Sequence, residues 1–399
     1  MIIERNRPSV DTVERALVSA RPGPGPDPVI NWLTAVLVTA GVFVIFDAGF
    51  ARSIQKGDGL VPGEFKSQVI FGLLAALIAY AVSRVPGNVW RRLSLPIFAV
   101  SMLGLVAVKI FGQEMNGAQR WLKIGPIQVQ PAEFMKIAAI VFVASVLADR
   151  KPWRRAKTTD WAQWLDRVAV LKFVRLLPMF AILAAVLLIE LEPDLGTAAV
   201  IGATGYFMFL FGGITTKSKL WVSAIALLLV GGLVLKSPFR MERVTNHVHR
   251  WEADRIDDVG YQTVQSEIAM ASGGLVGTGP GSGRVKHLMP AATTDFVFAT
   301  VAEETGLLGV MAILSLVGAL VWRIWLQALR CRNAFAQNLC FGVAIWLTIQ
   351  ATVNLMMANG FLPPIGIPFP FISSGGSSLI ALLIGVALCQ SASRMREAA

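Results

Sequence analysis

Long apolar runs separated by short polar connections dominate the chain. Each run approaches the roughly 20 residues that an α-helix needs to cross a bilayer, and few charges interrupt it. The pattern predicts an all-α polytopic membrane protein with about ten transmembrane helices. The predicted spans cover residues 29–51, 65–85, 90–111, 134–148, 176–189, 195–213, 220–235, 296–326, 338–357 and 376–391.

Polar segments at both ends and in one long loop divide the chain. Residues 1–28 carry four arginines and a Pro-Gly run but no small-residue cleavage site, so we expect a disordered cytoplasmic tail rather than a signal peptide. Residues 29–392 are expected to form one transmembrane domain, followed by a cytoplasmic tail at 393–399. Within this domain, residues 236–295 form a large loop between the seventh and eighth spans.

Composition and charge refine this picture. The 399 residues are 55% hydrophobic and 15% charged, which is typical of a membrane protein. With both termini in the cytoplasm, most of the 36 Lys and Arg residues lie on the cytoplasmic side, so the long loop is predicted to face outward. Contact with anionic lipid then accounts for the net charge of +11, and no nucleic-acid partner is expected. Cys331, Cys340 and Cys389 are odd in number, which argues against a disulfide framework.

The connection at 116–136 is too apolar for a solvent linker and too rich in Gly and Pro for a continuous helix. We expect it to lie along the outer interface of the membrane. Pro131 suits the first turn of a helix, on which Glu133 and Lys136 would pair at i,i+3 spacing. The pair has two interpretations. Either it allows two charges to be buried together, or it shapes a substrate cavity, because charges inside a membrane are commonly functional.

Three carboxylates, Glu190, Glu192 and Asp194, lie at the outer end of the fifth predicted span. Asp194 directly precedes the sixth span, where we expect it to be the helix N-cap. Capping does not account for Glu190 and Glu192, which leaves a divalent-cation site as an alternative.

The long loop contains two features that invite a ligand. His247 and His249 form a His-x-His pair, but no third ligand has the spacing of a zinc site, so we interpret them as surface histidines. The glycine-rich run 272–283 matches neither a P-loop nor a dinucleotide-binding fingerprint. It is either a flexible loop or a set of backbone N–H groups that binds phosphate together with Arg284 and Lys286.

Asp295 ends the long loop where the eighth span begins. There it is either a helix N-cap or a functional acid that meets both water and lipid. Glu303 follows two helical turns later, close to the same face. Residues 354–378 are apolar but contain four prolines. Because non-helical backbone survives at membrane depth only inside protein or along a cavity, we expect this segment to pack into the protein or line a site.

These segments together resemble the SEDS (RodA/FtsW/SpoVE) family of cell-wall glycan polymerases, over nearly the whole chain beyond the N-terminal tail. Residues 354–378 are similar to the family signature, with Asn354, Gly360, Pro363, Gly366, Pro370, Ser373, Gly375 and Gly376 in place. The Asn-Gly-Ala-x-Arg-Trp and Gln-Pro-x-Glu-x-x-Lys patterns, Glu192-Pro-Asp-Leu-Gly-Thr, Gly260-Tyr-Gln, Thr294-Asp-Phe and Glu303-Glu-x-Gly also fit.

The chain departs from the family pattern beside the candidate acid. Family members usually carry Glu and His just before Thr-Asp-Phe, whereas this chain has Ala291 and Thr293. Ser374 stands where Tyr is common. Asp295 itself is retained, so any role of the neighbouring Glu and His is absent or has moved.

The resemblance implies ten transmembrane helices and the polymerisation of lipid II, an undecaprenyl-pyrophosphate-linked disaccharide peptide, at the outer face of the cytoplasmic membrane. It also implies a class B penicillin-binding protein as partner, alongside other membrane proteins of the elongation or division complexes, and Asp295 as the catalytic acid/base. It does not separate elongation, division and sporulation.

Lipid II is α-linked and the glycan is β-1,4 linked, so a single displacement with inversion is the simplest chemistry. Asp295 would be the general base for the acceptor hydroxyl, with a pKa that burial raises and nearby cations lower. Arg120, Lys123, Arg240 and Arg243 are candidates to hold the departing pyrophosphate, with Lys136, oriented by Glu133, as an alternative. A bridging Mg²⁺ or Mn²⁺ is left open, and no metal ligand is assigned.

The other candidate substrate-binding residues are spread over several segments: Glu192, Asp194, Gln262, Gln265, Glu303, Ser373 and Ser377. Two further functions fit the same pattern. One is a flippase or transporter of lipid-linked precursors, and the other is a non-catalytic scaffold that activates the penicillin-binding protein.

Overall fold

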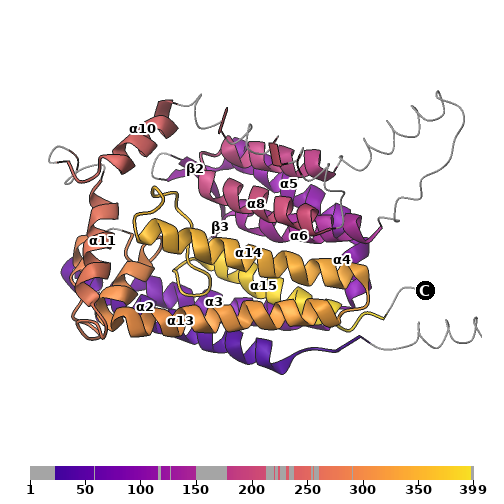
Figure 1. Ribbon diagram of the computed structural model, residues 1–399, viewed down its shortest axis with the longest axis horizontal. Helices are drawn as coiled ribbons and strands as arrows, with labels where there is room; N and C mark the ends of the chain where they lie inside the picture. Colours follow the sequence, from indigo (N-terminus) through magenta and orange to yellow (C-terminus); the bar gives the residue numbers. More distant parts are fainter. Residues whose placement is uncertain are drawn as a thin grey trace, which may run out of the picture.

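The structure is a computed structural model in which most of the predicted spans are helices. It describes residues 23–57, 59–115, 118–125, 127–149, 178–212, 220, 223–224, 231–232, 238–252, 255, 260–289 and 291–396. Nearly all of the seventh predicted span and residues 1–22 of the N-terminal tail lie outside these residues. The helices run side by side through the body of the molecule (Figure 1).

The helices begin and end close to the residues expected from the apolar runs. They are α2 (Pro28–Lys56), α3 (Gly63–Arg84), α4 (Gly87–Arg92), α5 (Ser94–Phe111), α6 (Pro131–Ala148), the helix Pro178–Glu190, α8 (Leu195–Phe211), α13 (Val297–Arg330), α14 (Ala334–Ala358) and α15 (Gly376–Ala392). In the described part of the chain, six helices are long and apolar enough to cross a membrane, and three shorter apolar helices accompany them. The prediction of a multi-pass helical membrane protein is confirmed.

Burial divides the helices into a central and an outer group. On α6 and α14 most side chains are buried against other helices. On α3 and α5, large apolar side chains such as Leu73, Leu77 and Leu103 are exposed by about 70%. A helix that is apolar all round but open on one side is stable where lipid covers that side. We therefore interpret the outer faces of α3 and α5 as lipid-facing.

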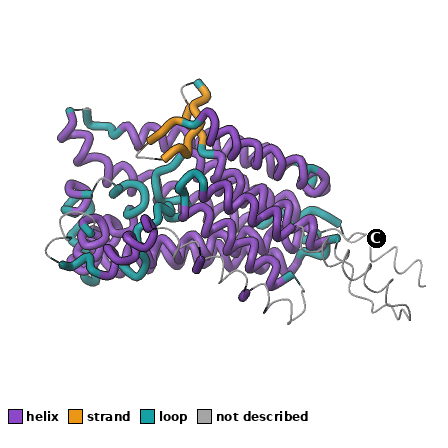
Figure 2. The backbone as a smooth tube through the Cα atoms, turned by 90° about the horizontal axis from the view of Figure 1, so that it is seen from above, coloured by secondary structure: helices purple, strands orange, loops and turns teal. Residues whose placement is uncertain are grey.

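One part of the predicted fold class is wrong, because the connection before α6 is a small antiparallel sheet. Its strands are β1 (Gln113–Met115), β2 (Ala118–Ile124) and β3 (Ile127–Val129), in the order β1-β2-β3. Gly125 adopts a left-handed φ of 62° in the tight turn between β2 and β3. Of the Gly and Pro residues that argued against a continuous helix here, Gly125 is a hairpin turn residue and Pro131 begins α6. Figure 2 shows the strands together at one edge of the molecule.

The long polar loop also contains helices that its composition did not predict. They are α10 (Pro238–Val248), α11 (Tyr261–Gly273) and α12 (Val285–Leu288). Figure 1 places α10 and α11 at the end of the helix bundle that lies opposite the C-terminus. A small apolar core, which includes Val285, Met289, Phe296 and Met357, joins α11 and α12 to the start of α13 and the end of α14.

The eighth span, α13, is broken at Gly306, which has φ 63° and ψ −165°. A break leaves backbone N–H and C=O groups without helical partners, which is costly inside a membrane. The loop 273–279 supplies these partners. Leu307 and Leu308 donate to two loop carbonyls at 3.0 and 3.1 Å, and two loop N–H groups donate to α13 carbonyls at 2.9 and 3.0 Å. The loop is thus hydrogen-bonded to α13 on both sides of the break.

The second half of the non-helical segment 359–375 is largely buried, as its prolines predicted, whereas Phe361 in its first half is 70% exposed. Ile367, Phe369, Phe371 and Ile372 are each exposed by 2% or less. The Phe369 ring packs against Phe298 at the start of α13, with the ring centroids 5.0 Å apart. The segment therefore lies inside the protein beside the turn that carries Asp295.

Candidate active site

Asp295 lies in the turn that enters α13, and it does not cap that helix. The helix begins at Val297, and Phe296 occupies the N-cap position without a side-chain hydrogen bond. The interpretation of Asp295 as a helix cap is therefore wrong. Among the described residues, no donor hydrogen-bonds to the Asp295 carboxylate. Its oxygens remain available for another group.

The non-helical segment and the end of α14 hold this turn by its backbone. Three consecutive carbonyls accept hydrogen bonds, those of Thr293, Thr294 and Asp295. Their donors are the Ser374 N–H at 2.9 Å, the Ser373 hydroxyl at 2.6 Å and the Asn354 amide at 2.8 Å. The candidate acid is fixed in place without any hydrogen bond to its carboxylate.

Contacts of two glycines place the start of α8 and Asp295 on the non-helical segment. A Cβ on Gly366, whose φ is 74°, would lie 3.8 Å from Asp295 Oδ2. A Cβ on Gly196, in the first turn of α8, would lie 2.4 Å from the Ile365 carbonyl oxygen, closer than any real Cβ contact. Glycine is therefore required at Gly196, and the N-terminus of α8 lies across the segment from Asp295.

Asp194 is the N-cap of α8, as predicted. Its carboxylate accepts from the Thr197 N–H at 3.1 Å and from the Gln130 side chain at 3.1 Å. The backbone N–H of Gln130 donates to the Ser377 hydroxyl oxygen at 3.1 Å. The structure thus brings Asp194 and Ser377, both predicted site residues, to the start of α6.

Burial and, to a smaller extent, the negative charge of Asp194 raise the pKa of Asp295 to about 6, against lowering by Arg120. The sequence did not decide whether burial or nearby cations have the larger effect on this pKa; in the structure burial has the larger effect. A carboxylate with this pKa is ionised at neutral pH and is a stronger base than an exposed aspartate.

Lys109 and Arg120 hold the turn between the helix Pro178–Glu190 and α8. Lys109 donates to the Leu191 carbonyl at 3.0 Å, and Arg120 Nε donates to the Glu192 carbonyl at 3.2 Å. Arg120 Nη2 also donates to the Pro193 carbonyl. These contacts fasten β2 to the turn and place the Arg120 charge near Asp194 and Asp295.

Glu192, in that turn, is buried, and neither of its carboxylate oxygens has a hydrogen-bond partner among the described residues. Burial and the charge of Asp194 raise its pKa to about 8, against lowering by Arg120 and Lys109. Glu192 is therefore largely neutral at neutral pH. No group of three His, Cys, Asp or Glu side chains in the described chain is arranged to hold a metal ion.

Glu133 and Lys136 form the predicted ion pair, with 2.6 Å between Oε1 and Nζ, and both side chains are buried. Lys136 Nζ also lies 3.5 Å from Gln350 Oε1 on α14. Burial and pairing oppose the alternative that Lys136 binds a departing pyrophosphate, since its ammonium group is already used inside the protein. The interpretation as a pair that allows two charges to be buried fits these contacts.

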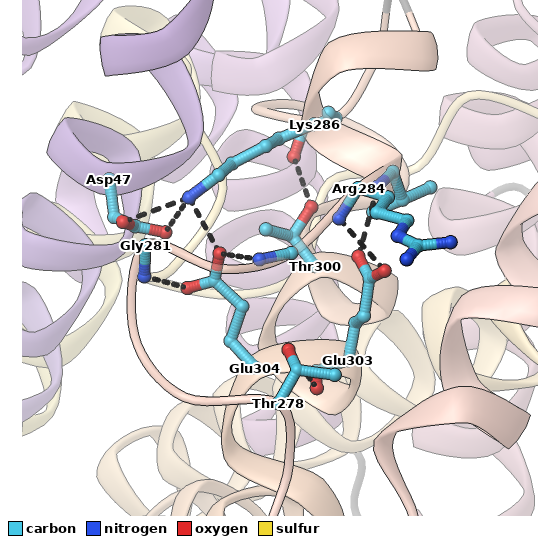
Figure 3. Close-up of polar contacts among 11 residues, drawn as sticks. Asp47, Thr278, Gly281, Arg284, Lys286, Thr300, Glu303 and Glu304 are labelled. Atoms are coloured by element: carbon cyan, nitrogen blue, oxygen red, sulfur yellow. Dashed lines mark hydrogen bonds and ion pairs between the residues drawn. The ribbon is translucent and has the colours of Figure 1, made fainter.

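The glycine-rich loop binds carboxylates of the protein itself (Figure 3). Glu303 accepts from the N–H groups of Arg284 and Val285 at 2.9 and 3.0 Å, and Glu304 accepts from those of Gly281 and Gly283 at 3.1 and 3.0 Å. The prediction that these N–H groups bind phosphate is wrong, because they already have acceptors.

Lys286, which the sequence grouped with a phosphate site, is also used internally. It is 3% exposed and lies 2.6 Å from Glu304 and 3.1 Å from Asp47 on α2. Glu303 and Glu304 therefore fix the loop to α13. Lys286, which pairs with Glu304 and with Asp47, connects the loop and α13 to α2 (Figure 3). Asp47 carried no signal in the sequence, because its partner lies in a distant loop.

The remaining predicted residues lie on α11, β2 and α10. Gln262 and Gln265 are partly exposed on α11, Lys123 is exposed on β2, and the side chain of Arg240 lies outside what the structure describes. Partial burial and the like charge of Arg120 lower the pKa of Arg243 on α10. Two predicted phosphate-binding arginines, Arg120 and Arg243, thus lie within electrostatic reach of each other and, through Arg120, of Asp295.

Comparison with known proteins gives consistent matches over most of the chain. The model of the FtsW, RodA and SpoVE family, described as cell cycle proteins, matches residues 29–398. A probable peptidoglycan glycosyltransferase FtsW of Idiomarina loihiensis is 34% identical over 91% of this chain and 86% of that protein. The stage V sporulation protein E of Bacillus subtilis is 31% identical over 92% of this chain and 97% of that protein.

Two solved structures share the fold. A chain from a peptidoglycan synthase complex that coordinates polymerization and crosslinking has a TM-score of 0.74 and 28% identity, covering 92% of this chain and 98% of that one. The rod shape determining protein RodA of Thermus thermophilus has a TM-score of 0.65 and 27% identity, covering 93% and 97%.

Proposed function

This chain belongs to the FtsW, RodA and SpoVE family and is a peptidoglycan glycosyltransferase, and from that premise we propose that it polymerises lipid II with Asp295 as the general base. The observation that carries the proposal is the Asp295 carboxylate, which is held by its backbone, is without a donor among the described residues and has a pKa of about 6.

The reaction follows from the two linkages. The 4-hydroxyl of the acceptor sugar attacks C1 of the donor sugar while Asp295 takes the hydroxyl proton, and the bond between C1 and the lipid pyrophosphate breaks. The pyrophosphate leaves with the bonding electron pair, and the configuration at C1 inverts. General-base assistance of this kind contributes typically about 10²–10⁴-fold to the rate.

We assign the leaving pyrophosphate to the cations near Asp295. Arg120 and Arg243 repel each other, so an anion between them would relieve that repulsion. Lys123, exposed on β2, and Arg240 on α10 remain further candidates. A Mg²⁺ or Mn²⁺ ion that bridges the pyrophosphate stays a prediction, and no step of the mechanism is routed through it.

The location of the reaction is part of the proposal. The chain is a multi-pass membrane protein, and the excess of Lys and Arg predicts cytoplasmic termini. Asp295 directly precedes Phe296, which packs with residues of α11 and α12. Figure 1 shows α11 at the end of the bundle away from the C-terminus, and we assign this end to the outer face of the cytoplasmic membrane.

We further propose a class B penicillin-binding protein as the partner. The supporting observation is the similarity to a chain of a synthase complex in which polymerization and crosslinking are coordinated. Which of the elongation, division or sporulation complexes the chain joins is not part of the proposal.

The test uses the purified full-length protein in detergent with fluorescent lipid II, alone and with a co-purified class B penicillin-binding protein. We expect wild type to form glycan polymer and Asp295→Asn, folded and equally abundant, to be slower by about 10²–10⁴-fold, with a residual rate that can still be measured. Polymer formation by Asp295→Asn at the wild-type rate would reject Asp295 as the base.

The same assay separates the alternatives. A flippase forms no polymer in detergent, because there is no membrane to cross. A scaffold forms polymer only through its partner and tolerates Asp295→Asn.

A further inference from the structure

The first observation concerns one face of α14, where three polar side chains recur at i, i+4 and i+8. They are Trp346, Gln350 and Asn354, and each is fully buried. Trp346 Nε1 donates to Gln350 Oε1 at 2.7 Å. Spacings of four residues place side chains on the same helix face, so these three form one row along the helix. A buried polar row inside a membrane protein needs partners, because each unpaired group is costly.

The amide nitrogens of Gln350 and Asn354 find acceptors in the backbone of the non-helical segment and of the turn at Asp295, whereas Asn354 Oδ1 has no hydrogen-bond partner among the described residues. Gln350 Nε2 donates to the Pro368 carbonyl at 3.0 Å. Asn354 Nδ2 donates to both the Ile367 carbonyl, at 2.6 Å, and the Asp295 carbonyl, at 2.8 Å. One amide therefore ties the non-helical segment and the acid-bearing turn to the same helix.

Ser373 adds the second attachment. Its hydroxyl donates to the Thr294 carbonyl at 2.6 Å and accepts from the Phe369 N–H at 2.8 Å. The serine side chain thus closes the non-helical segment on itself and fastens it to the residue before Asp295. Both of its hydrogen bonds are to the backbone, so its position is fixed from two sides.

We propose that Gln350, Asn354 and Ser373, here named the positioning frame, fix Asp295 for the transfer reaction through its backbone and so leave both carboxylate oxygens free for the acceptor hydroxyl. The inference rests on the proposed function of Asp295. It assigns Asn354 and Ser373 as positioning residues rather than substrate ligands, and it assigns a role to Gln350, which carried no signal in the sequence.

The physical reason lies in how a base is held. A carboxylate held by donors on its own oxygens loses basicity, because hydrogen bonds to the charged form stabilise it. A carboxylate held through its backbone keeps its lone pairs while its position stays fixed. Misplacement of a reacting group by about 1 Å can cost about 10²-fold in rate, so the frame is expected to act on kcat.

The Glu133–Lys136 pair supports the frame from α6. Lys136 Nζ lies 3.5 Å from Gln350 Oε1, the same oxygen that accepts from Trp346. The amide of Gln350 is thereby oriented with its nitrogen toward Pro368, since its oxygen faces two donors. The buried ion pair then acts on the site through Gln350 and not by contact with the substrate.

The test measures polymerisation rates against lipid II concentration for Ser373→Ala and Asn354→Leu. We expect kcat to fall about 10–100-fold with KM changed less than about twofold. Ser373→Thr, which keeps the hydroxyl, should recover most of the rate.

Matched controls remove the same kinds of contact elsewhere. Gln327 is a buried amide that donates to the Cys389 carbonyl, and Ser391 is a buried serine that donates to the Val85 carbonyl. Gln327→Leu and Ser391→Ala should lower thermal stability but keep kcat.

A double-mutant cycle separates positioning from general loosening of the fold. If Ser373 acts through Asp295, Ser373→Ala should not slow the residual rate of Asp295→Asn any further. The same factor in both backgrounds, or wild-type kcat in folded Ser373→Ala and Asn354→Leu proteins, overturns the positioning frame. Wild-type polymerisation by Asp295→Asn alone overturns instead the proposed function on which the frame rests.

Discussion

At the scale of single residues, the charges around Asp295 set its basicity. Asp194 lies close enough to raise the pKa of Asp295, and Arg120 lowers it, while burial has the largest effect. The base must be ionised to accept a proton, so we expect the polymerisation rate to fall as the pH drops below about 6.

Asp194→Asn tests the electrostatic part of this account. Asparagine caps helices as well as aspartate does, so α8 should remain folded. Loss of the negative charge should lower the pKa of Asp295 and move the acid limb of kcat/KM to lower pH. Asp149→Asn, at an exposed pair with Arg91, is the control and should leave the limb in place. An unmoved limb in Asp194→Asn would contradict the coupling.

Glu192 makes a second prediction, about stability. Its pKa is about 8 in the folded protein and near 4.5 when unfolded, so the folded state binds the proton more tightly. The contribution of Glu192 to stability is therefore fully present below about pH 4.5, and it is lost as the pH rises through about 8. Glu192→Gln, which cannot ionise, should melt at a higher temperature than wild type at pH 9 and at a similar temperature at pH 5.

Thermal unfolding in detergent at the two pH values measures this effect. Glu114→Gln, at an exposed position on β1, is the comparison, and it should change the melting temperature little at either pH. A Glu192→Gln protein that is destabilised equally at both pH values would show that the carboxylate has a charged partner.

The sequence predicted residues whose roles depend on near neighbours. Asp194 as a cap and Glu133 with Lys136 as a pair follow from spacing along one helix, and both are confirmed. The pKa of Asp295 depends on burial and on Arg120, which is distant in sequence. Residue spacing along the sequence could not predict whether burial or Arg120 has the larger effect on this pKa.

At the scale of elements, the break in α13 and the glycine-rich loop depend on each other. A Cβ on Gly277, whose φ is 87°, would lie 2.1 Å from the Glu304 carbonyl oxygen. Only glycine fits there, so the glycine run is a requirement for close backbone pairing. Composition alone made this loop look flexible, because the groups that it pairs with lie about 30 residues later along the chain.

Gly277→Ala should therefore separate the loop from α13 and lower both thermal stability and polymerisation. Gly318→Ala is the matched control on α13, because a Cβ there meets nothing within 4 Å. Alanine in a helix interior should stabilise the protein by up to about 1 kcal/mol relative to glycine. Equal melting temperatures for the two variants would contradict the pairing.

Apolar length predicted the spans well, and the hairpin and loop helices poorly. A membrane-spanning helix is dictated by its own composition, as in α5 and α15. In contrast, β1 to β3, α11 and α12 are short. Backbone pairing between neighbouring strands stabilises β1 to β3, and apolar contacts with distant segments stabilise α11 and α12.

At the scale of the whole molecule, two polar networks lie toward opposite ends of the helix bundle. One surrounds Asp295, and the other joins Asp27, Arg323 and Gln390. Arg323 binds the Asp27 carboxylate at 2.6 Å, and the Asp27 backbone exchanges hydrogen bonds with Gln390 at 2.7 and 2.8 Å. This second network ties the entry of α2 to α13 and α15.

Asp27→Asn separates the roles of the two ends. Asparagine keeps the cap of α2 but weakens the charged contact with Arg323, which is partly exposed. We expect a loss of about 1–2 kcal/mol in unfolding free energy and an unchanged polymerisation rate per folded protein. A large loss of kcat without loss of stability would indicate that the two ends are coupled.

The break at Gly306 also bears on how the protein is made. Until residues 273–279 pair with it, α13 has unpaired backbone groups on both sides of Gly306. The loop precedes α13 in the chain and is predicted to be exported, so it must cross the membrane before this span can settle in lipid. The hydrogen bonds of α13 therefore require that the loop is translocated first. If α13 were inserted before the loop, its unpaired backbone groups would have to stay in contact with water.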